Sequence, residues 1–214
     1  QLIKRDVDMR FKGALLGVLW PLITPLLTLA MYAVVFGYFL PSRWPGVEGI
    51  TGFALMLFPG LIVFTFFAEC VNRAPNLITS NPNFVKKVVF PLEVLPWVAF
   101  TSALFHAAIS LIVLLLAQLI INHSIPLTAL LLPIVVLPLF LGIMGMSWFF
   151  ASLGVYLRDI SQITVMFTTV MLFMSAVFFP ITALPEKYQF WIRINPLAYI
   201  IEQSRNVLIF GQAP

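Results

Sequence analysis

The sequence predicts an all-α, polytopic membrane helix bundle with five visible spans and an interfacial helix at its N-terminus. The stretch from Val94 to Ile121 contains no Asp, Glu, Lys or Arg. As a helix it would be about 42 Å long, more than the ~30 Å hydrocarbon core of a bilayer requires. Composition agrees, since 61% of residues are hydrophobic and only 9% are charged, against ~25% charged in soluble domains. Four further uncharged, mostly apolar segments complete the set: 15–40, 50–68, 127–157 and 163–179.

Strand architectures do not explain these segments. Buried strands give apolar runs of only ~4–8 residues, and transmembrane barrels alternate polar and apolar residues. We expect residues 1–214 to form one membrane domain without a sizeable soluble core. The single Cys70 excludes an intrachain disulfide. Because the chain opens at Gln1 and ends at Pro214 soon after an apolar stretch, we expect a sixth span beyond it.

The basic residues predict the orientation. Short cytoplasmic loops of membrane proteins carry an excess of Lys and Arg. With alternating spans, four basic residues fall on one side, namely Arg43, Lys187, Arg193 and Arg205. The other side, which includes the N-terminus, is predicted to be cytoplasmic because it carries Lys4, Arg5, Arg10, Lys12, Arg73, Lys86, Lys87 and Arg158. The scattered charges do not indicate a nucleic-acid partner; membrane lipids are the expected contacts.

The first elements are an interfacial helix and a bent span. Within residues 1–14, apolar side chains recur at helical spacing among charged ones, which predicts a helix lying in the headgroup plane. It serves either as a topology anchor or as a platform for a cytoplasmic partner. In 15–40, Pro21 and Pro25 predict a bend. Trp20, Tyr32 and Phe36 belong either to an interfacial belt or to a surface on which sugar rings slide.

The region 69–93 is predicted to be a cytoplasmic coupling region. Glu69 and Arg73 have the favourable i, i+4 order of a helical pair. Farther on, Lys86 and Lys87 lie among apolar residues, which predicts a short amphipathic helix that ends at Pro91. It is either a linker on the bilayer surface or a docking element that receives motion from a soluble engine.

The next two spans carry few polar residues. A lone histidine such as His106 in 94–121 is more often a hydrogen-bonded packing residue than a ligand. Small residues in 127–157 predict tight helix packing, and this segment is long enough to tilt. The residues concerned are Gly142, Gly145, Ser147, Ala151 and Gly154.

Residues 181–210 do not resemble a span. Pro180, Pro185 and Pro196 break them into short pieces. We expect two short helices on the outer side, in or dipping into the outer leaflet.

Several kinds of chemistry are missing from the sequence. It has no phosphate-binding loop for ATP hydrolysis and no metal-ligand motif. The five predicted spans contain no acidic residue of the kind that drives proton or sodium coupling. We therefore expect a transport subunit, not an enzyme, that is powered by another chain.

Four ordered motifs resemble the permease subunits of ABC-2 type exporters of polysaccharides. They are Arg10–Leu26, Asn81–Glu93, Tyr156–Ile160 and Asn195–Leu197. The resemblance implies a multi-pass homodimer in the bacterial inner membrane, assembled with two nucleotide-binding ATPase subunits. It implies a lipid-linked polysaccharide substrate such as O-antigen, capsule or teichoic acid. This chain would hold no cofactor, because ATP and Mg belong to the ATPase.

The resemblance also implies roles for particular residues. The first and fifth spans would border the channel, with aromatic candidates Trp20, Tyr32, Phe36, Phe173 and Phe178. The short outer helices would gate the exit, with candidates Tyr188, Trp191, Asn195 and Pro196. The ATPase would contact Arg5, Arg10, Lys12, Arg73, Lys86 and Lys87.

Two alternatives stay open at this point. The same architecture could export a small drug or a lipid, which would need a closed pocket with a few polar groups. A membrane-embedded glycosyl- or acyltransferase would need clustered carboxylates, or a His paired with an acid, near a membrane face.

Overall fold

The computed structural model describes residues 20–35, 44, 49–82 and 91–214, and within these it is helical with no strand. This confirms the predicted all-α membrane bundle. The elements are α2 (Trp20–Val34), α3 (Gly49–Arg73), the 3-10 turn η3 (Ala74–Asn76), α5 (Val94–Asn122), η4 (Leu127–Leu131), α6 (Leu132–Tyr156), α7 (Ile160–Met174), η5 (Ile181–Ala183), α8 (Glu186–Arg193), α9 (Pro196–Arg205) and the π-helical turn η6 (Asn206–Phe210).

Three of the helical stretches in the described residues are long and apolar enough to cross a membrane: Gly49–Asn76, Val94–Asn122 and Leu127–Tyr156. The first is mostly buried in the protein, whereas in the other two most residues are only partly buried or exposed. On α5 and α6, for example, Ile120 is 72% and Leu141 71% exposed. An apolar outer surface of this kind suits a bilayer, where lipid tails solvate it.

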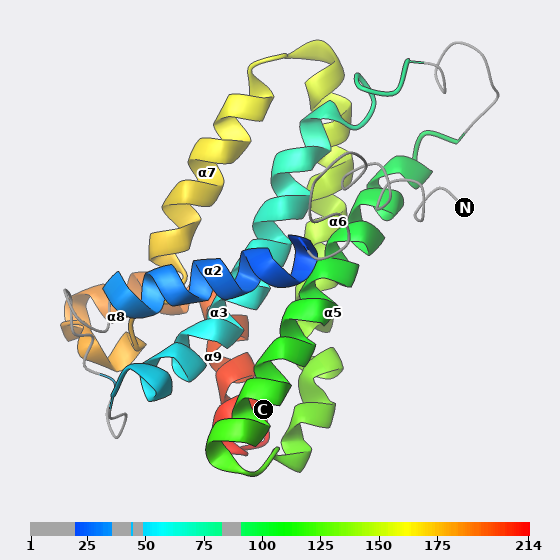
Figure 1. The fold of residues 1–214 in the computed structure, drawn as a ribbon. Helices are drawn as coiled ribbons and strands as arrows, with labels where there is room; N and C mark the ends of the chain where they lie inside the picture. The colour runs from blue at the N-terminus through cyan, green and yellow to red at the C-terminus, as the bar shows by residue number, and fades with distance from the viewer. Residues whose placement is uncertain (1–19, 36–43, 45–48, 83–90) are drawn as a thin grey trace.

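Helix α3 forms the centre of the bundle (Figure 1). It packs against α2, α5, α6, α7 and α9. Three phenylalanines join α3, α5 and α6, because the ring of Phe66 lies edge-on to Phe100 and Phe140 with centroids 5.3 and 5.4 Å away. Edge-to-face aromatic pairs stabilise a fold by more than the burial of their apolar area alone would.

The end of α6 packs closely on η3. A Cβ placed on Gly154 would lie 2.2 Å from the carbonyl oxygen of Pro75, so glycine is required there. A Cβ placed on Gly142 or on Gly145 would have no neighbouring atom within 4 Å. The expected tight packing through small residues therefore holds at Gly154 but not at these two glycines within the described part of the chain.

The observed helices differ from two of the predicted segments. Helix α3 continues past Ala68 to Arg73, since no helix breaker precedes Pro75. Helix α7 covers Ile160–Met174 instead of 163–179. At about 22 Å it is shorter than the hydrocarbon core, and a turn with Ala176 at φ 53° follows it.

Parts of the predicted organisation fall outside the described residues. These are the interfacial helix 1–14, both ends of the segment 15–40, and the section 83–90 of the coupling region. The described part of the first segment, α2, lies across α3 and α5 (Figure 1).

Candidate functional site

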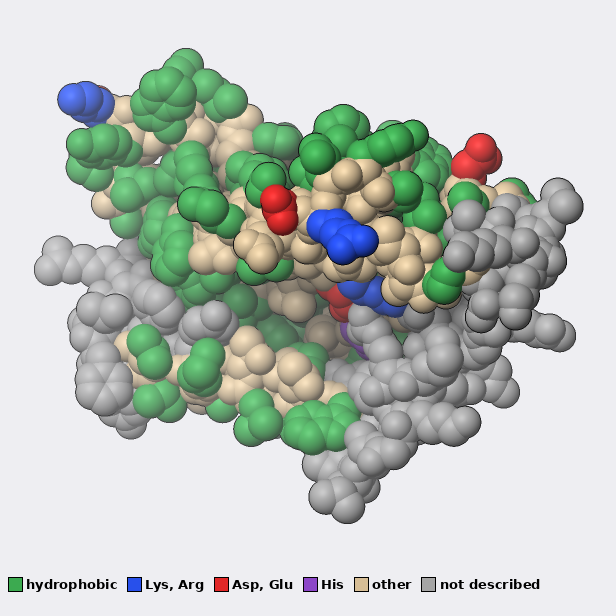
Figure 2. All heavy atoms as spheres, turned by 90° about the horizontal axis from the view of Figure 1, so that it is seen from above, with side chains coloured by type: hydrophobic (Ala, Val, Ile, Leu, Met, Phe, Trp, Pro, Cys, Tyr) green, Lys and Arg blue, Asp and Glu red, His purple; other side chains and the backbone are tan. Residues whose placement is uncertain are grey.

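A cavity of about 280 Å³ lies between α2, α3 and α5. Its wall combines apolar residues with the polar side chains of Thr24, Thr28, Thr65, Glu69, His106 and Ser110. Figure 2 looks onto the end of the bundle at which α3 ends, and it shows a hollow with charged and histidine side chains at its floor.

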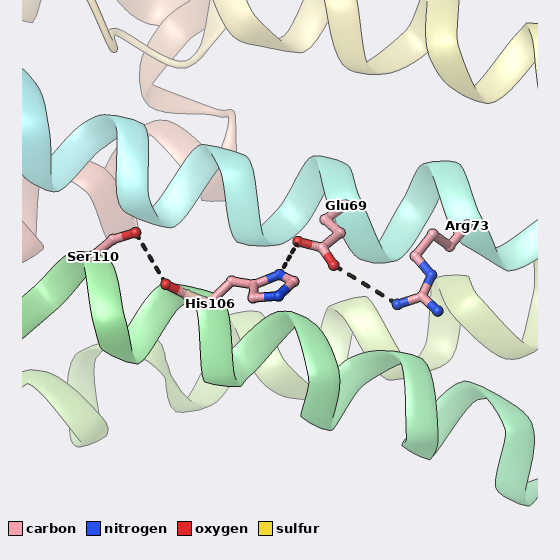
Figure 3. A network of polar contacts seen from close by, with 4 residues as sticks. All are labelled: Glu69, Arg73, His106 and Ser110. Atoms are coloured by element: carbon pink, nitrogen blue, oxygen red, sulfur yellow. Dashed lines mark hydrogen bonds and ion pairs between the residues drawn. The ribbon is translucent and has the colours of Figure 1, made fainter. Parts of the chain in front are cut away.

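A polar network joins α3 to α5 in this cavity (Figure 3). The Glu69 carboxylate lies 3.2 Å from Nδ1 of His106 and 3.7 Å from Nη1 of Arg73. One turn farther along α5, the Ser110 hydroxyl donates to the His106 carbonyl over 3.0 Å. The Glu69 and His106 side chains are only 18% and 17% exposed. Ionisable residues so placed within membrane helices are costly and mark functional positions.

The network corrects one expectation and supports another. An acidic residue does belong to a membrane-crossing helix, because Glu69 follows the predicted boundary Ala68 by one position and lies on α3. The expected Glu69–Arg73 pair is present. His106 is hydrogen-bonded, as expected of a packing histidine, but its partner is a carboxylate. The uninterrupted helical sequence between Phe66 and Arg73 was the signal that could have revealed this.

The same helix also contacts α7 through polar groups. Asn72 and Thr168 exchange hydrogen bonds of 3.1 and 3.2 Å. Since an interhelical hydrogen bond in a membrane contributes about 0.6–2 kcal/mol, this pair fixes the register between α3 and α7.

The aromatic channel candidates do not form one surface among the described residues. Trp20 lines the 280 Å³ cavity. Phe173 is 58% exposed on α7, whereas Phe178 is buried at 4% exposure, with ring centroids 5.8 Å apart. In this conformation Phe178 is therefore a core residue. The Tyr32 side chain and Phe36 lie outside the described part.

The outer-gate candidates divide into two kinds. Tyr188 and Trp191 are exposed on α8. Asn195 and Pro196 instead begin α9. The Asn195 side chain caps α9 by accepting from the Leu197 amide at 3.0 Å, and its amide group donates to the Met174 carbonyl at 3.1 Å. Asn195 thus connects the start of α9 to the end of α7.

Arg205 is the residue that sequence reasoning did not identify. It is 3% exposed, and its guanidinium donates to the carbonyls of Met56, Ala176 and Val177 over 2.9, 2.9 and 2.6 Å. It also lies 4.5 Å from the ring centroid of Trp44. Arg205 therefore ties α9 to α3 and to the turn after α7.

Burial lowers the pKa of Arg205 to about 9, and the neighbouring carboxylate of Glu202 partly opposes this shift. The side chain stays charged at neutral pH. A buried charge of this kind is retained only where hydrogen bonds satisfy it, which the three carbonyls do.

Among the expected ATPase contacts, only Arg73 lies in the described residues, next to Glu69 at the end of α3. Arg5, Arg10, Lys12, Lys86 and Lys87 lie outside them. The described residues hold no group of three or more His, Cys, Asp or Glu side chains that could bind a metal.

The fold and these sites define an all-α membrane protein, with a mainly apolar cavity that carries a few polar side chains between α2, α3 and α5, and with the short helices α8 and α9 at the other end of the bundle. The family model "ABC-2 type transporter" matches residues 1–209, and the chain belongs to this family.

Similar proteins have more specific names. The chain is 23% identical to the O-antigen export system permease protein RfbA of Myxococcus xanthus, across 100% of this chain and 80% of that protein. It is 24% identical to the RfbA protein of Klebsiella pneumoniae, across 98% and 79%. It is also 24% identical to the polysialic acid transport protein KpsM of Escherichia coli, across 98% and 80%.

Proposed function

We propose that this chain is the transmembrane permease of an ATP-driven exporter that moves lipid-linked polysaccharide across the bacterial inner membrane. The observation that carries the proposal is its similarity, over nearly its whole length, to permeases named for O-antigen export and polysialic acid transport. The cavity with its few polar side chains and the exposed apolar residues of α5 and α6 suit a transport subunit.

The energy comes from a partner in this proposal. The sequence lacks a phosphate-binding loop, so ATP hydrolysis is assigned to a separate chain. By resemblance to the ABC-2 polysaccharide exporters, two copies of the chain assemble with two ATPase subunits, which bind ATP and Mg. The N-terminus is cytoplasmic, so α3 ends and α5 begins at the ATPase side. Arg5, Arg10, Lys12, Arg73, Lys86 and Lys87 contact the ATPase there. Helices α8 and α9 then lie at the outer side.

Depletion of the chain in its native bacterium tests the transport role. We expect surface polysaccharide to disappear and lipid-linked polymer to accumulate on the cytoplasmic side of the inner membrane. Unchanged surface polymer after complete depletion would contradict the proposal.

Purification tests the partnership. Affinity purification of the tagged permease in mild detergent should recover an ATPase that carries a phosphate-binding loop, in a 1:1 ratio. ATP hydrolysis by the permease alone would contradict the assignment of the engine to another chain.

A further inference from the structure

A second cavity, of about 200 Å³, lies beside Arg205 at the end of the bundle that contains α8 and α9. We call it the Arg205 cavity. Its wall includes Trp44, Thr182, Glu202, Arg205, Asn206 and Phe210. Clefts that enclose drug-sized ligands measure about 300–1,000 Å³, so this cavity suits one small ring.

Two polar groups on this wall lack partners within the described residues. The indole nitrogen Nε1 of Trp44 is buried and has no hydrogen-bond acceptor there. The Glu202 carboxylate likewise takes part in no hydrogen bond or ion pair with a described side chain, although it is close enough to Arg205 to affect its pKa. A buried donor without an acceptor costs about 1–3 kcal/mol, which a ligand oxygen would recover.

The charges on the wall exclude a strongly anionic ligand. Glu202 and Arg205 bring opposite charges, so the wall is close to neutral. Arg205 is already committed to three backbone carbonyls, whereas a phosphate would face the Glu202 carboxylate. A neutral ligand that both donates and accepts hydrogen bonds fits better.

Aromatic side chains complete the wall. Trp44 and Phe210 offer apolar surface next to a carboxylate, the Thr182 hydroxyl and the Asn206 amide. A sugar ring matches this combination, because it has apolar C–H faces and an edge of hydroxyl groups.

We propose that the Arg205 cavity binds one neutral sugar ring, with Glu202 accepting hydrogen bonds from its hydroxyls and the Trp44 indole donating to one of its oxygens. Arg205 is a positioning residue, since it holds Trp44 and the turn after α7 in place. The identification of the ring as a unit of the exported polymer rests on the proposed function. At the outer end of the bundle, a weak sugar site would hold the exported polymer briefly and then release it.

The test is saturation-transfer NMR on the complete permease–ATPase complex in nanodiscs. The probes are the methyl glycosides of glucose, mannose, galactose and N-acetylglucosamine, and the repeating-unit oligosaccharide of the host's own surface polymer. We expect at least one of them to bind, and Glu202→Gln or Trp44→Phe to weaken that binding about tenfold. Glu186→Gln, an exposed carboxylate on α8, is the matched control and should bind like the wild type.

Three results would overturn the proposal. One is that no probe binds the wild-type complex, and another is that both variants bind as tightly as the wild type. The third is binding of phosphoethanolamine, in place of any sugar, in a manner that depends on Glu202, which would assign the cavity to a lipid headgroup. Should Glu202→Gln fail to fold, Trp44→Phe keeps an aromatic ring and removes the indole donor.

The experiments distinguish a failure of the sugar-binding proposal from a failure of the proposed export function. Loss of surface polymer on depletion, combined with unchanged sugar binding in the variants, would remove the cavity assignment and leave polysaccharide export in place. Normal surface polymer on depletion would instead remove the export role.

Discussion

The carboxylate of Glu69 lies 3.2 Å from the imidazole of His106, although the two residues are 37 positions apart in the chain. The contact joins α3, the central helix, to α5, of which a small part is buried in the protein. Arg73, one turn farther along α3, lies 3.7 Å from the same carboxylate, so the three side chains form one polar network at the end of α3.

Glu69 and His106 should be energetically coupled. We expect Glu69→Gln and His106→Ala each to lower the free energy of unfolding by about 1–3 kcal/mol, because each leaves a part-buried polar partner behind. The double variant should lose less than the sum, with a coupling energy of about 0.5–3 kcal/mol. Chemical unfolding in detergent micelles measures all four proteins.

The matched control pairs Glu69→Gln with Ser110→Ala. Ser110 donates only to the backbone carbonyl of His106, so this pair should be additive within about 0.5 kcal/mol. Additivity of Glu69→Gln with His106→Ala would show that the 3.2 Å contact carries no energy.

Gly154 should tolerate no side chain. Gly154→Ala places a methyl group 2.2 Å from the Pro75 carbonyl, so α6 or η3 must shift, which costs about 1–3 kcal/mol. The control is Gly145→Ala, where nothing lies within 4 Å and alanine favours the helix by about 1 kcal/mol. Thermal unfolding should separate the two variants in opposite directions, and equal behaviour would argue against close packing at Gly154.

Arg205 should be needed to hold α9 in place. Arg205→Lys keeps the charge but replaces the planar fork with a single ammonium, which cannot serve carbonyls of α3 and of the turn after α7 together. We expect a loss of about 2–5 kcal/mol in the free energy of unfolding. Arg193→Lys on the exposed face of α8, where the guanidinium contacts Gln189 at 3.2 Å, should change it by under about 0.5 kcal/mol.

The contribution of Arg205 should not vary near neutral pH. Burial lowers its pKa to about 9, so the folded protein releases this proton before the unfolded chain does as pH rises. The cost of burying the charge is fully present below pH 9 and declines above it, and stability from this group rises only there. The difference in melting temperature between wild type and Arg205→Met should therefore be constant from pH 6 to 8; a slope in that window would contradict a charged Arg205.

Lys86 and Lys87 should matter for coupling but not for membrane insertion. We expect the double charge reversal to glutamate to reduce recovery of the ATPase and to lower transport, because both charges are proposed to face the ATPase. Reversal of Lys187 and Arg193 on α8 is the control and should leave ATPase recovery unchanged. Transport at the wild-type rate in the first variant would make the loop a simple linker.

The sequence by itself determined the membrane class and the long helices α5 and α6. Both depend on local hydropathy, which can be determined without knowledge of the tertiary packing. The predicted segments 94–121 and 127–157 therefore agree closely with Val94–Asn122 and Leu127–Tyr156. The capping position of Asn195 before Pro196 is similarly a local feature.

Tertiary structure decided what no local pattern contains. Helix α7 ends at Met174, and the turn after it presents the carbonyls of Ala176 and Val177 to Arg205, which comes from a later part of the chain. Glu69 finds His106 only because α3 and α5 pack side by side. Such contacts depend on how distant segments pack together. Burying a charged side chain costs free energy unless hydrogen bonds satisfy it, and here the hydrogen-bond partners come from those distant segments.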